Sequence, residues 1–364
     1  MAENVRIGVV GTSGFAEMFH LPSLRSHPRV EITAVCGRNR DRAEELAGKY
    51  GIPHVFTDYH AMITSGTLDA LVVAVPDALH YPITMAALAA GLHVLCEKAL
   101  ALNAAQAREM YEKAEASGRK HMVGFAWRAV PPFRYMHRLV EDGYIGRCYH
   151  ALFRYEGGYG RDASYGWRFD RQQGNGILGD LGSHMIDFAR WYVGDIAKVS
   201  GHLATFVARP GADGGPLDPA NDTALVAVEF ANGAQGVIHL SAVTHVGDRG
   251  QVMQIALYGE AGSLELDFTF AGAELRGLPQ GEEQWQTLVV PAELEGRADQ
   301  PPPFGMPILA PLVSLPVGDR LFVDAILEDR PVSPSFYDGW QAQAVIDAAL
   351  ASHVHGRWVA VDGR

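Results

Sequence analysis

Residues 176–195, GILGDLGSHMIDFARWYVGD, carry side chains that can move protons. Asp180 and His184 are four residues apart and Asp187 follows three later, so a helix would place all three on one face. A carboxylate beside an imidazole suits general acid–base chemistry. This face either lines a pocket or belongs to an ordinary surface helix. The opposite, apolar face would consist of Leu181, Met185, Phe188 and Tyr192.

Four glycines crowd the start of this helix: Gly174, Gly176, Gly179 and Gly182. Each glycine costs about 1 kcal/mol relative to alanine inside a helix, and such a cost is typical of a functional site. We expect them to let the chain approach a ligand closely and turn sharply into the helix. A metal site on the same face is an alternative, but no fourth ligand has a suitable spacing, so no metal is predicted.

The stretch at residues 11–16, Gly-Thr-Ser-Gly-Phe-Ala, has the form of a phosphate-binding turn. It separates an apolar run from a helical segment, where a dinucleotide pyrophosphate would meet the unpaired N–H groups of the helix. The match to G-x-G-x-x-G/A is imperfect, because Ser13 stands at the second glycine position. The alternative is a glycine turn required only by geometry. The residues expected to bind the dinucleotide are Gly11, Ser13, Gly14, Phe15 and Ala16.

The second apolar run ends in Cys36-Gly37-Arg38-Asn39-Arg40, which contains no carboxylate. NAD-binding domains usually carry Asp or Glu here to bind the ribose 2′-hydroxyl. Arg38 can instead pair with a 2′-phosphate, and Arg42 can assist. The turn, with Gly37 and Asn39, therefore favours NADP over NAD as the cofactor, although solvated surface arginines are the simpler alternative.

Apolar runs alternate with helix-length segments over the first third of the chain, at residues 6–10, 31–37, 68–76 and 92–98. Such spacing implies right-handed crossovers and a parallel sheet. We expect residues 1–125 to form a doubly wound, Rossmann-type domain.

Residues 126–364 predict a second α/β domain with a large, mostly antiparallel open sheet. Alternating strands are joined across Ala231-Asn232-Gly233 and again across Glu260-Ala261-Gly262, which are hairpin signals. The free face of such a sheet can join a second subunit, so a homodimer or homotetramer is expected. Two Pro- and Gly-rich loops, 208–222 and 296–316, can cover the mouth of an active site, and the helices within 317–355 can pack back on the first domain.

Composition narrows the class of protein. The 364 residues are 48% hydrophobic and 20% charged, which is ordinary for a globular enzyme. A net charge of -12 argues against a nucleic-acid partner, which needs clustered Lys and Arg. Three separated cysteines suggest neither a disulfide framework nor a metal site. No segment is apolar enough for a signal peptide or a membrane span, so we expect a cytoplasmic protein without a membrane partner.

The order of five motifs resembles the Gfo/Idh/MocA oxidoreductases, the family of glucose-fructose oxidoreductase and inositol dehydrogenase. The motifs are GTSGFA (11–16), VPDALH (75–80), CEKAL (96–100), GNGILGDLGSHMID (174–187) and FYDGWQAQAVIDAAL (336–350). The likeness covers essentially the whole chain. It implies a Rossmann domain followed by an open α/β domain whose sheet commonly mediates oligomers.

The resemblance also implies roles for particular residues. Lys98, Asp180 and His184 match the catalytic Lys, Asp and His of the family. Residues implied to border the cofactor are Val75, Pro76, His80 and Glu97, with Trp167 and Arg168 near the nicotinamide end.

These roles make chemical sense for oxidation of a secondary alcohol of a sugar, inositol or related polyol. His184 would exchange the hydroxyl proton, Lys98 would stabilise the developing negative charge on the same oxygen, and Asp180 would orient one of the two. Lys98 in a structural ion pair with Glu97 or Asp180 is the plainer alternative. Weaker candidates for contacts with the polyol are Trp127, Arg128, Tyr155 and Asp170.

Two functional alternatives remain open at this point. The first is a dinucleotide-binding sensor that has lost catalysis, against which the retained Lys98, Asp180 and His184 argue. The second is a glycoside-processing enzyme that uses a recycled cofactor transiently. The chain also departs from the family at Ala99, where proline usually follows the lysine, and the sequence leaves open whether the Lys98–Ala99 peptide is cis or trans.

Overall fold

The computed structural model describes residues 4–297 and 301–363. The chain divides into two compact units. The first unit is built from residues 1–101, 105–129 and 295–340, and the second unit from residues 102–104, 130–294 and 341–364.

A six-stranded parallel sheet forms the centre of the first unit, with the order β3-β2-β1-β4-β5-β6. The strands are β1 (Val5–Val10), β2 (Val30–Cys36), β3 (His54–Phe56), β4 (Ala70–Val73), β5 (His93–Cys96) and β6 (His121–Val123). β1 pairs in parallel with both β2 and β4, so the strand order reverses beside it. The predicted Rossmann-type sheet is confirmed, and ligands of such sheets bind at the carboxyl ends of the strands near this reversal.

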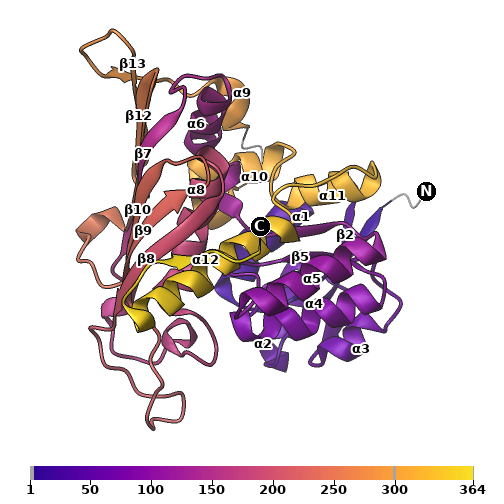
Figure 1. Cartoon of the computed structure of the whole chain (residues 1–364). Helices are drawn as coiled ribbons and strands as arrows, with labels where there is room; N and C mark the ends of the chain where they lie inside the picture. Colours follow the sequence, from indigo (N-terminus) through magenta and orange to yellow (C-terminus); the bar gives the residue numbers. More distant parts are fainter. Residues whose placement is uncertain (1–3, 298–300, 364) are drawn as a thin grey trace. The chain divides into compact units, whose positions relative to one another are not determined.

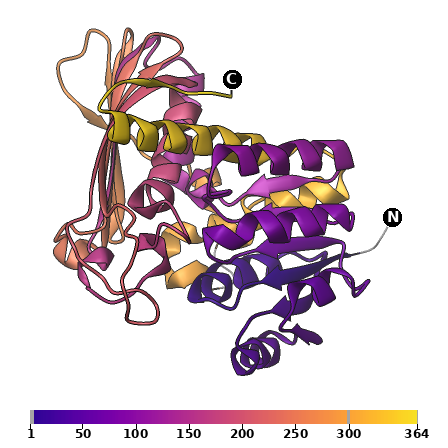
Figure 2. The same cartoon turned by 60° about the horizontal axis from the view of Figure 1, so that its bottom comes forward.

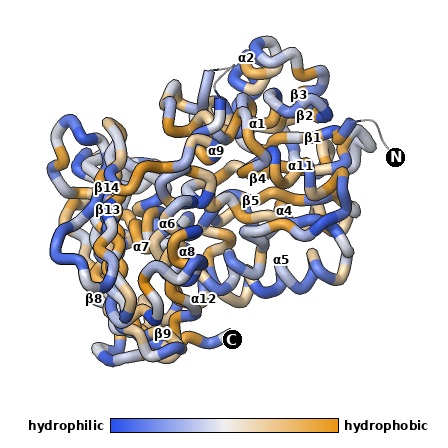
Figure 3. Tube along the Cα trace, turned by 90° about the horizontal axis from the view of Figure 1, so that it is seen from above, coloured by the Kyte–Doolittle hydropathy of each residue, from blue (hydrophilic) through white to orange (hydrophobic). Residues whose placement is uncertain are grey.

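Helices on this sheet bury apolar side chains while keeping a polar exterior. Figure 3 shows β4 and β5 as hydrophobic and α5 as mostly hydrophilic. The main helical segments are η1 (Ala16–His20), α1 (Leu21–Arg25), α2 (Arg40–Tyr50), α3 (Tyr59–Ile63), η2 (Asp77–Leu79), α4 (His80–Ala89), α5 (Ala104–Ser117) and η3 (Ala126–Ala129). Leu21, Leu24 and Leu46 join the strands in one buried cluster.

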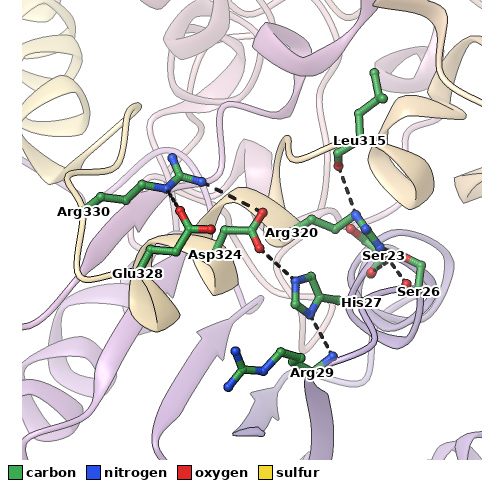
Figure 4. Close-up of polar contacts among 9 residues, drawn as sticks. All are labelled: Ser23, Ser26, His27, Arg29, Leu315, Arg320, Asp324, Glu328 and Arg330. Atoms are coloured by element: carbon green, nitrogen blue, oxygen red, sulfur yellow. Dashed lines mark hydrogen bonds and ion pairs between the residues drawn. The ribbon is translucent and has the colours of Figure 1, made fainter. Parts of the chain in front are cut away.

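A late segment of the chain completes the first unit. Its elements are η7 (Pro303–Gly305), η8 (Pro307–Leu309), α10 (Pro311–Ser314) and α11 (Asp319–Leu327). Phe322 and Val323 of α11 are fully buried in the same core as the sheet. Polar contacts join α11 to the α1 region: His27 lies 3.0 Å from Asp324, and Arg320 donates to the Ser26 carbonyl at 2.6 Å (Figure 4).

The second unit contains a nine-stranded sheet with the order β14-β13-β12-β11-β7-β10-β9-β8-β15. Its strands are β7 (Cys148–Gly157), β8 (Ile196–Ala204), β9 (Thr223–Phe230), β10 (Gln235–Ser241), β11 (Gln251–Gly259), β12 (Gly262–Thr269), β13 (Gly272–Pro279), β14 (Gln286–Thr287) and β15 (Val359–Ala360). Figures 1 and 2 show the long strands side by side. Within this nine-stranded sheet, as far as the structure describes it, β7 and β10 run parallel and the other neighbouring strands run antiparallel. Both expected hairpins, β9–β10 and β11–β12, are confirmed.

Helices cover one face of this sheet (Figure 1). The rings of Phe133 on α6 and Phe188 on α8 stack with centroids 4.8 Å apart, and Phe268 of β12 packs against Phe133. The other helical segments of this unit are η4 (Tyr159–Arg161), η5 (Trp167–Phe169), η6 (Gly247–Arg249) and α9 (Ala292–Glu295). The bounds of the covering helices are α6 (Pro131–Glu141), α7 (Gly176–Asp180) and α8 (Gly182–Tyr192).

The last helix, α12 (Phe336–His355), begins in the first unit and belongs to the second from Gln341 onward. Its later part is attached to β8, because the Gly201 amide donates to the Ser352 hydroxyl at 2.9 Å. The second sheet also exposes apolar side chains, with Leu152, Leu225, Val237 and Trp358 each between 41% and 48% exposed. Leu152, Val237 and Trp358 form part of a groove with His150 and Glu229.

A buried charge pair anchors the loop at 205–222. Asp222 is fully buried and accepts hydrogen bonds from the amides of Phe206 and Val207. Arg209 lies 3.5 Å from the same carboxylate, donates to the Gly160 carbonyl and stacks over Phe169 at 3.8 Å. Although its composition is rich in Pro and Gly, this loop is therefore attached specifically to residues 160–169.

Replacing Gly11 should damage the first unit. Gly11 has φ +125° and a Cβ there would lie 2.1 Å from the Ala74 carbonyl oxygen, which is backbone and cannot swing aside. We expect Gly11→Ala to lower the free energy of unfolding by about 2 kcal/mol or more in chemical denaturation. Gly48→Ala is the matched control, because nothing lies within 4 Å of its Cβ and the site is helical. It should raise stability by about 0.5–1 kcal/mol, and equal effects of both variants would contradict the argument.

Replacing Asp222 should damage the second unit. Asp222→Ala leaves two backbone amides and the buried Arg209 without their shared acceptor, so the free energy of unfolding should fall by about 3–5 kcal/mol. Asp213→Ala removes an exposed acceptor of the Gly215 amide from the same loop, and its effect should stay within about 1 kcal/mol. The comparison is made by urea unfolding, and a mild Asp222→Ala phenotype would mean that the loop is not anchored by this charge.

Candidate functional site

The glycine turn lies at the carboxyl end of β1 in the first unit. Gly11 passes against the backbone of Ala74, at the end of β4, so only a residue without a side chain fits there. Ser13 and Gly14 are exposed where the following helix begins. The Phe15 ring stacks on Phe19 at 4.9 Å and lies 5.8 Å from Phe304. The expected loop 296–316 thus reaches the glycine turn with Phe304, and its residues 298–300 lie outside the described residues.

The end of β2 supplies the second group of predicted cofactor residues. Gly37 is packed against Thr12, since a Cβ at Gly37 would lie 2.4 Å from the Thr12 methyl group. Asn39 caps α2 by accepting from the Arg42 amide at 3.0 Å. The Arg42 guanidinium is paired with Glu17 and with Glu45. Arg38 is exposed and has no ion pair or hydrogen bond within the part of the chain that the structure describes.

His80 connects the loops that follow β4 and β5. Its ring nitrogens lie 2.8 Å from the carbonyl oxygens of Val75 and Ala99, and the ring is completely buried. Burial lowers the pKa of His80, against the opposing effect of the two carbonyls. Pro76 immediately precedes the short helix η2, in the loop that follows β4. The sequence motifs VPDALH and CEKAL are therefore held together by one imidazole.

Glu97 and Lys98 follow β5 directly. The Glu97 carboxylate is buried and lies 3.2 Å from Nε2 of His20. Gly124 leaves room for it, because a Cβ at Gly124 would lie 2.2 Å from Glu97 Oε1. The Lys98 amide donates to Glu97 Oε2 at 3.3 Å, and the Lys98–Ala99 peptide is cis.

The glycine-rich helix of the second unit differs from its prediction. It is two segments, α7 and α8, interrupted at Leu181. The surface-helix alternative is wrong, because Ser183, His184 and Asp187 are as buried as the apolar positions. Two expected glycines do allow close approaches, but to the unit's own chain. A Cβ at Gly176, which has φ +66°, would lie 2.3 Å from the Asn221 carbonyl, and one at Gly182 would lie 2.7 Å from Leu240.

Asp180 ends α7 and is held by two donors. The Tyr159 hydroxyl donates to its Oδ2 at 2.6 Å, and Nε of Arg168 lies 2.9 Å from the same oxygen. Burial, followed by the negative charge of Asp180, raises the pKa of Tyr159 well above its usual value, so this hydroxyl stays protonated. The Arg168 guanidinium also lies over the Trp167 ring at 4.4 Å. Asp180 is thus a positioned carboxylate. Of the two residues that hold it, Arg168 was predicted as a site residue and Tyr159 was not.

The remaining predicted residues fall into two groups by unit. In the second unit, the Tyr155 ring lies 6.4 Å from that of His184, and its hydroxyl donates to Gln251 at 2.6 Å. Asp170 accepts from the Tyr165 hydroxyl at 3.1 Å. In the first unit, Arg128 is paired with Asp338 at 3.1 Å, next to Trp127.

Lys98 belongs to the first unit, whereas Asp180 and His184 belong to the second. That all three face one substrate stays a prediction.

Two groups of residues were missed from the sequence. Tyr159 lies in the stretch GGYG, which has no catalytic signature, and only its contact with Asp180 reveals it. His20 and Asp319 are 299 residues apart, so no spacing rule connects them. Within residues 4–297 and 301–363, three or more His, Cys, Asp or Glu side chains nowhere gather as metal ligands would. The helices of those residues include none long and apolar enough to cross a membrane.

Comparisons with known proteins agree with this architecture. Residues 5–125 match the family model described as "Oxidoreductase family, NAD-binding Rossmann fold", and residues 133–265 match the GFO/IDH/MocA C-terminal domain. Levoglucosan dehydrogenase of Pseudarthrobacter phenanthrenivorans is 28% identical over 99% of this chain and 98% of its own. D-glucoside 3-dehydrogenase of Escherichia coli is 30% identical over 76% of this chain and 82% of its own.

A solved structure of a relative has the same fold over nearly the whole chain. Levoglucosan dehydrogenase in complex with NADH and levoglucosan superposes with a TM-score of 0.87 at 26% identity, covering 99% of this chain and 100% of that chain. The fold, the two family models and the full-length relatives agree with the resemblance found in the five sequence motifs. The chain belongs to the Gfo/Idh/MocA family and is an oxidoreductase with an NAD-binding Rossmann fold.

Proposed function

We propose that this oxidoreductase transfers hydride between a nicotinamide dinucleotide and a secondary alcohol or ketone of a sugar, inositol or related polyol. The observation that carries the proposal is the fixed carboxylate of Asp180, which two donors hold at the junction of α7 and α8, one helical turn before His184. A carboxylate and an imidazole built into a buried helix start suit proton transfer better than they suit packing.

The first unit fits a dinucleotide on structural grounds. The glycine turn opens a helix whose first N–H groups lack partners within the helix, and such a turn at the reversal of strand order favours a pyrophosphate. The loops after β4 and β5 are joined by His80, which places Pro76 and Glu97 at the same edge of the sheet. When bound there, the nicotinamide would supply the hydride acceptor or donor.

The chain's own residues would handle the proton and the charge. His184 takes the hydroxyl proton during oxidation and returns it during reduction. The Lys98 ammonium donates a hydrogen bond to the same oxygen and stabilises the negative charge that develops there. Asp180, which Tyr159 and Arg168 hold, orients one of these two groups.

The substrate class rests on the relatives and on the second unit. Both similar enzymes carry names of dehydrogenases for sugars or their derivatives. The Tyr159 hydroxyl and the Arg168 guanidinium contact Asp180, and the Trp167 ring lies against Arg168. Proteins use hydroxyl, guanidinium and ring groups of this kind to bind polyols. We keep Tyr155 and Asp170 as weaker candidates for substrate contact.

We further propose that the cofactor is NADP rather than NAD. Exposed Arg38, together with the lack of a carboxylate after β2, favours NADP. The solved levoglucosan dehydrogenase structure names NADH as its ligand. Because Arg42 is already paired with Glu17, Arg38 is the residue on which a preference for NADP depends.

The exposed apolar face of the nine-stranded sheet supports a homodimer or homotetramer formed through that sheet. Residence in the cytoplasm stays a prediction from the sequence.

Loss of the proposed acid–base should remove turnover. In an NAD(P)H absorbance assay across a panel of sugars and polyols, His184→Ala should lower the rate about 10²- to 10⁴-fold while cofactor binding remains. His60→Ala, an exposed histidine on α3, is the control and should retain the rate.

Other outcomes of the assay point to the two alternatives. Cofactor binding without turnover on any compound would favour a dinucleotide sensor. Conversion of a glycoside over many cycles without net formation of NAD(P)H would favour redox-assisted glycoside processing.

Cofactor preference should depend on Arg38. Calorimetric titration of the wild type should give tighter binding of NADP⁺ than of NAD⁺, and Arg38→Ala should weaken NADP⁺ about tenfold or more while leaving NAD⁺ nearly unchanged. Arg40→Ala is the control, because that arginine is exposed nearby but paired with Glu44 at 2.9 Å. Tighter binding of NAD⁺ by the wild type would refute the NADP preference.

A further inference from the structure

His20 lies between two carboxylates inside the first unit. Its Nδ1 is 3.1 Å from both oxygens of Asp319, and its Nε2 is 3.2 Å from Oε1 of Glu97. All three side chains are buried, with 1% of His20, 3% of Asp319 and 9% of Glu97 exposed. Three elements far apart in the sequence therefore meet at one imidazole: the helix after β1, the end of β5 and the start of α11.

A charged imidazole suits this arrangement better than a neutral one. A neutral imidazole has only one N–H, so one of its nitrogens would present a lone pair to a carboxylate. An imidazolium donates to Asp319 through Nδ1 and places its second N–H on the side of Glu97, at an ion-pair distance of 3.2 Å. Its charge compensates buried carboxylates that would otherwise be very unfavourable. Burial by itself would lower the pKa of His20, but Asp319 and then Glu97 outweigh burial and raise it to about 10.

His27, seven residues later and just beyond the end of α1, offers a contrast. Its Nε2 lies 3.0 Å from Asp324 of α11, but its Nδ1 accepts a hydrogen bond from the Arg29 amide at 3.1 Å (Figure 4). The neutral tautomer with one N–H satisfies both contacts. Both histidines contact α11, His20 through Asp319 and His27 through Asp324. A variant of His27 therefore tests the loss of a contact with α11, whereas a variant of His20 also tests the loss of the charge between two carboxylates.

The position of His20 connects it with cofactor binding. Its ring touches the edge of Phe15 in the glycine turn at a centroid distance of 5.5 Å. On the other side it holds Glu97, whose neighbour is Lys98. The chain from Asp319 through His20 ends at the carboxyl edge of the sheet, where a dinucleotide binds in folds of this type.

We propose that His20 is a positioning residue, an imidazolium anchored by Asp319 that keeps Glu97 ionised and aimed as a hydrogen-bond acceptor for a hydroxyl of the bound dinucleotide. This inference rests on the proposed function, because it assigns a task to the same cofactor site. It assigns Asp319, at the start of α11 and 196 residues beyond Val123 at the end of the last strand of the sheet, to the cofactor site as the anchor.

The charge count of the three residues makes the proposal testable. The wild-type group carries one net negative charge, and His20→Gln raises this to two. In this variant the two buried carboxylates lose the cation that lies between them, so uptake of a proton by the pair becomes more favourable as the pH falls. Protonated Glu97 is a poorer acceptor, and cofactor affinity should then fall with falling pH. His20→Gln/Asp319→Asn restores one net negative charge and should recover the pH-independent affinity.

The first experiment measures the charge directly, without cofactor. In protein labelled with ¹⁵N-histidine, the His20 signals, assigned by their loss in His20→Gln, should report protonation of both ring nitrogens at about pH 8. A single protonated nitrogen at that pH would overturn the proposal. This result does not depend on whether the protein is a sugar dehydrogenase.

The second experiment measures binding of NADH, or of NADPH if that binds tighter, by fluorescence between about pH 6 and about pH 8. The wild type and His27→Gln should bind the cofactor with nearly constant affinity over this range. The affinity of His20→Gln for the cofactor should fall by roughly tenfold or more between about pH 8 and about pH 6. The double variant should lose that slope. A constant affinity of folded His20→Gln, or a double variant with an equal slope, would overturn the proposal.

The two failures are distinguishable. If the wild type binds neither cofactor, the proposed function fails together with the task assigned to Glu97, while the nitrogen signals still decide whether His20 is charged. If His20→Gln does not fold, the nitrogen signals are assigned with Asp319→Asn, which should shift His20 and leave His27 unchanged. A His20 signal indifferent to Asp319→Asn would contradict the anchoring role.

Discussion

The first unit is organised around the close approach of two backbones at the point where the order of its strands reverses. Gly11 leaves β1 so near to the Ala74 carbonyl that no side chain fits between them. This contact directs the chain into the exposed turn at Ser13 and Gly14, and it sets that turn beside the loops that follow β4 and β5. The cofactor site depends on this arrangement, since phosphate recognition by backbone N–H groups requires an exposed helix start at a defined place.

Buried polar groups then give the site its precision. His80 joins the loops after β4 and β5 through two carbonyls, and His20 joins Glu97 to α11. Such groups are unfavourable inside a protein unless their partners are in place, so they select one arrangement of the loops over its neighbours. In the second unit, Tyr159 and Arg168 hold Asp180 from more exposed positions.

In each unit, a segment rich in Pro or Gly is fixed in place by specific side-chain contacts. The loop around 205–222 has the composition of a mobile connection, but the buried pair of Asp222 and Arg209 attaches it to residues 160–169. The segment 301–316 has several prolines, and its Phe304 packs against the ring of Phe15. Both segments lie next to predicted site residues. Local fixation of this kind keeps the donors around Asp180 and the rings around the glycine turn in place.

The sequence by itself determined the elements whose signals are local. Alternating apolar runs predicted the parallel sheet, Asn-Gly and Ala-Gly turns predicted two hairpins, and five motifs predicted the family. Each of these depends on residues within a few positions of one another. The helix at 176–192 shows the limit, because its helical periodicity was right but the break at Leu181 and the burial of Asp187 were not apparent from it. In the folded chain, Gly176 and Gly182 pack against Asn221 and Leu240, which are distant in the sequence.

Only the tertiary structure decided which charges meet. Asp180 with Tyr159, Glu97 with His20, and His20 with Asp319 come from segments 21 to 299 residues apart or from different elements, and nothing in a local pattern selects those pairs. The physical reason is that apolar burial, which local periodicity encodes, tolerates many partners, whereas a buried charge tolerates few. The partners of a buried charge are therefore known only once the chain has folded.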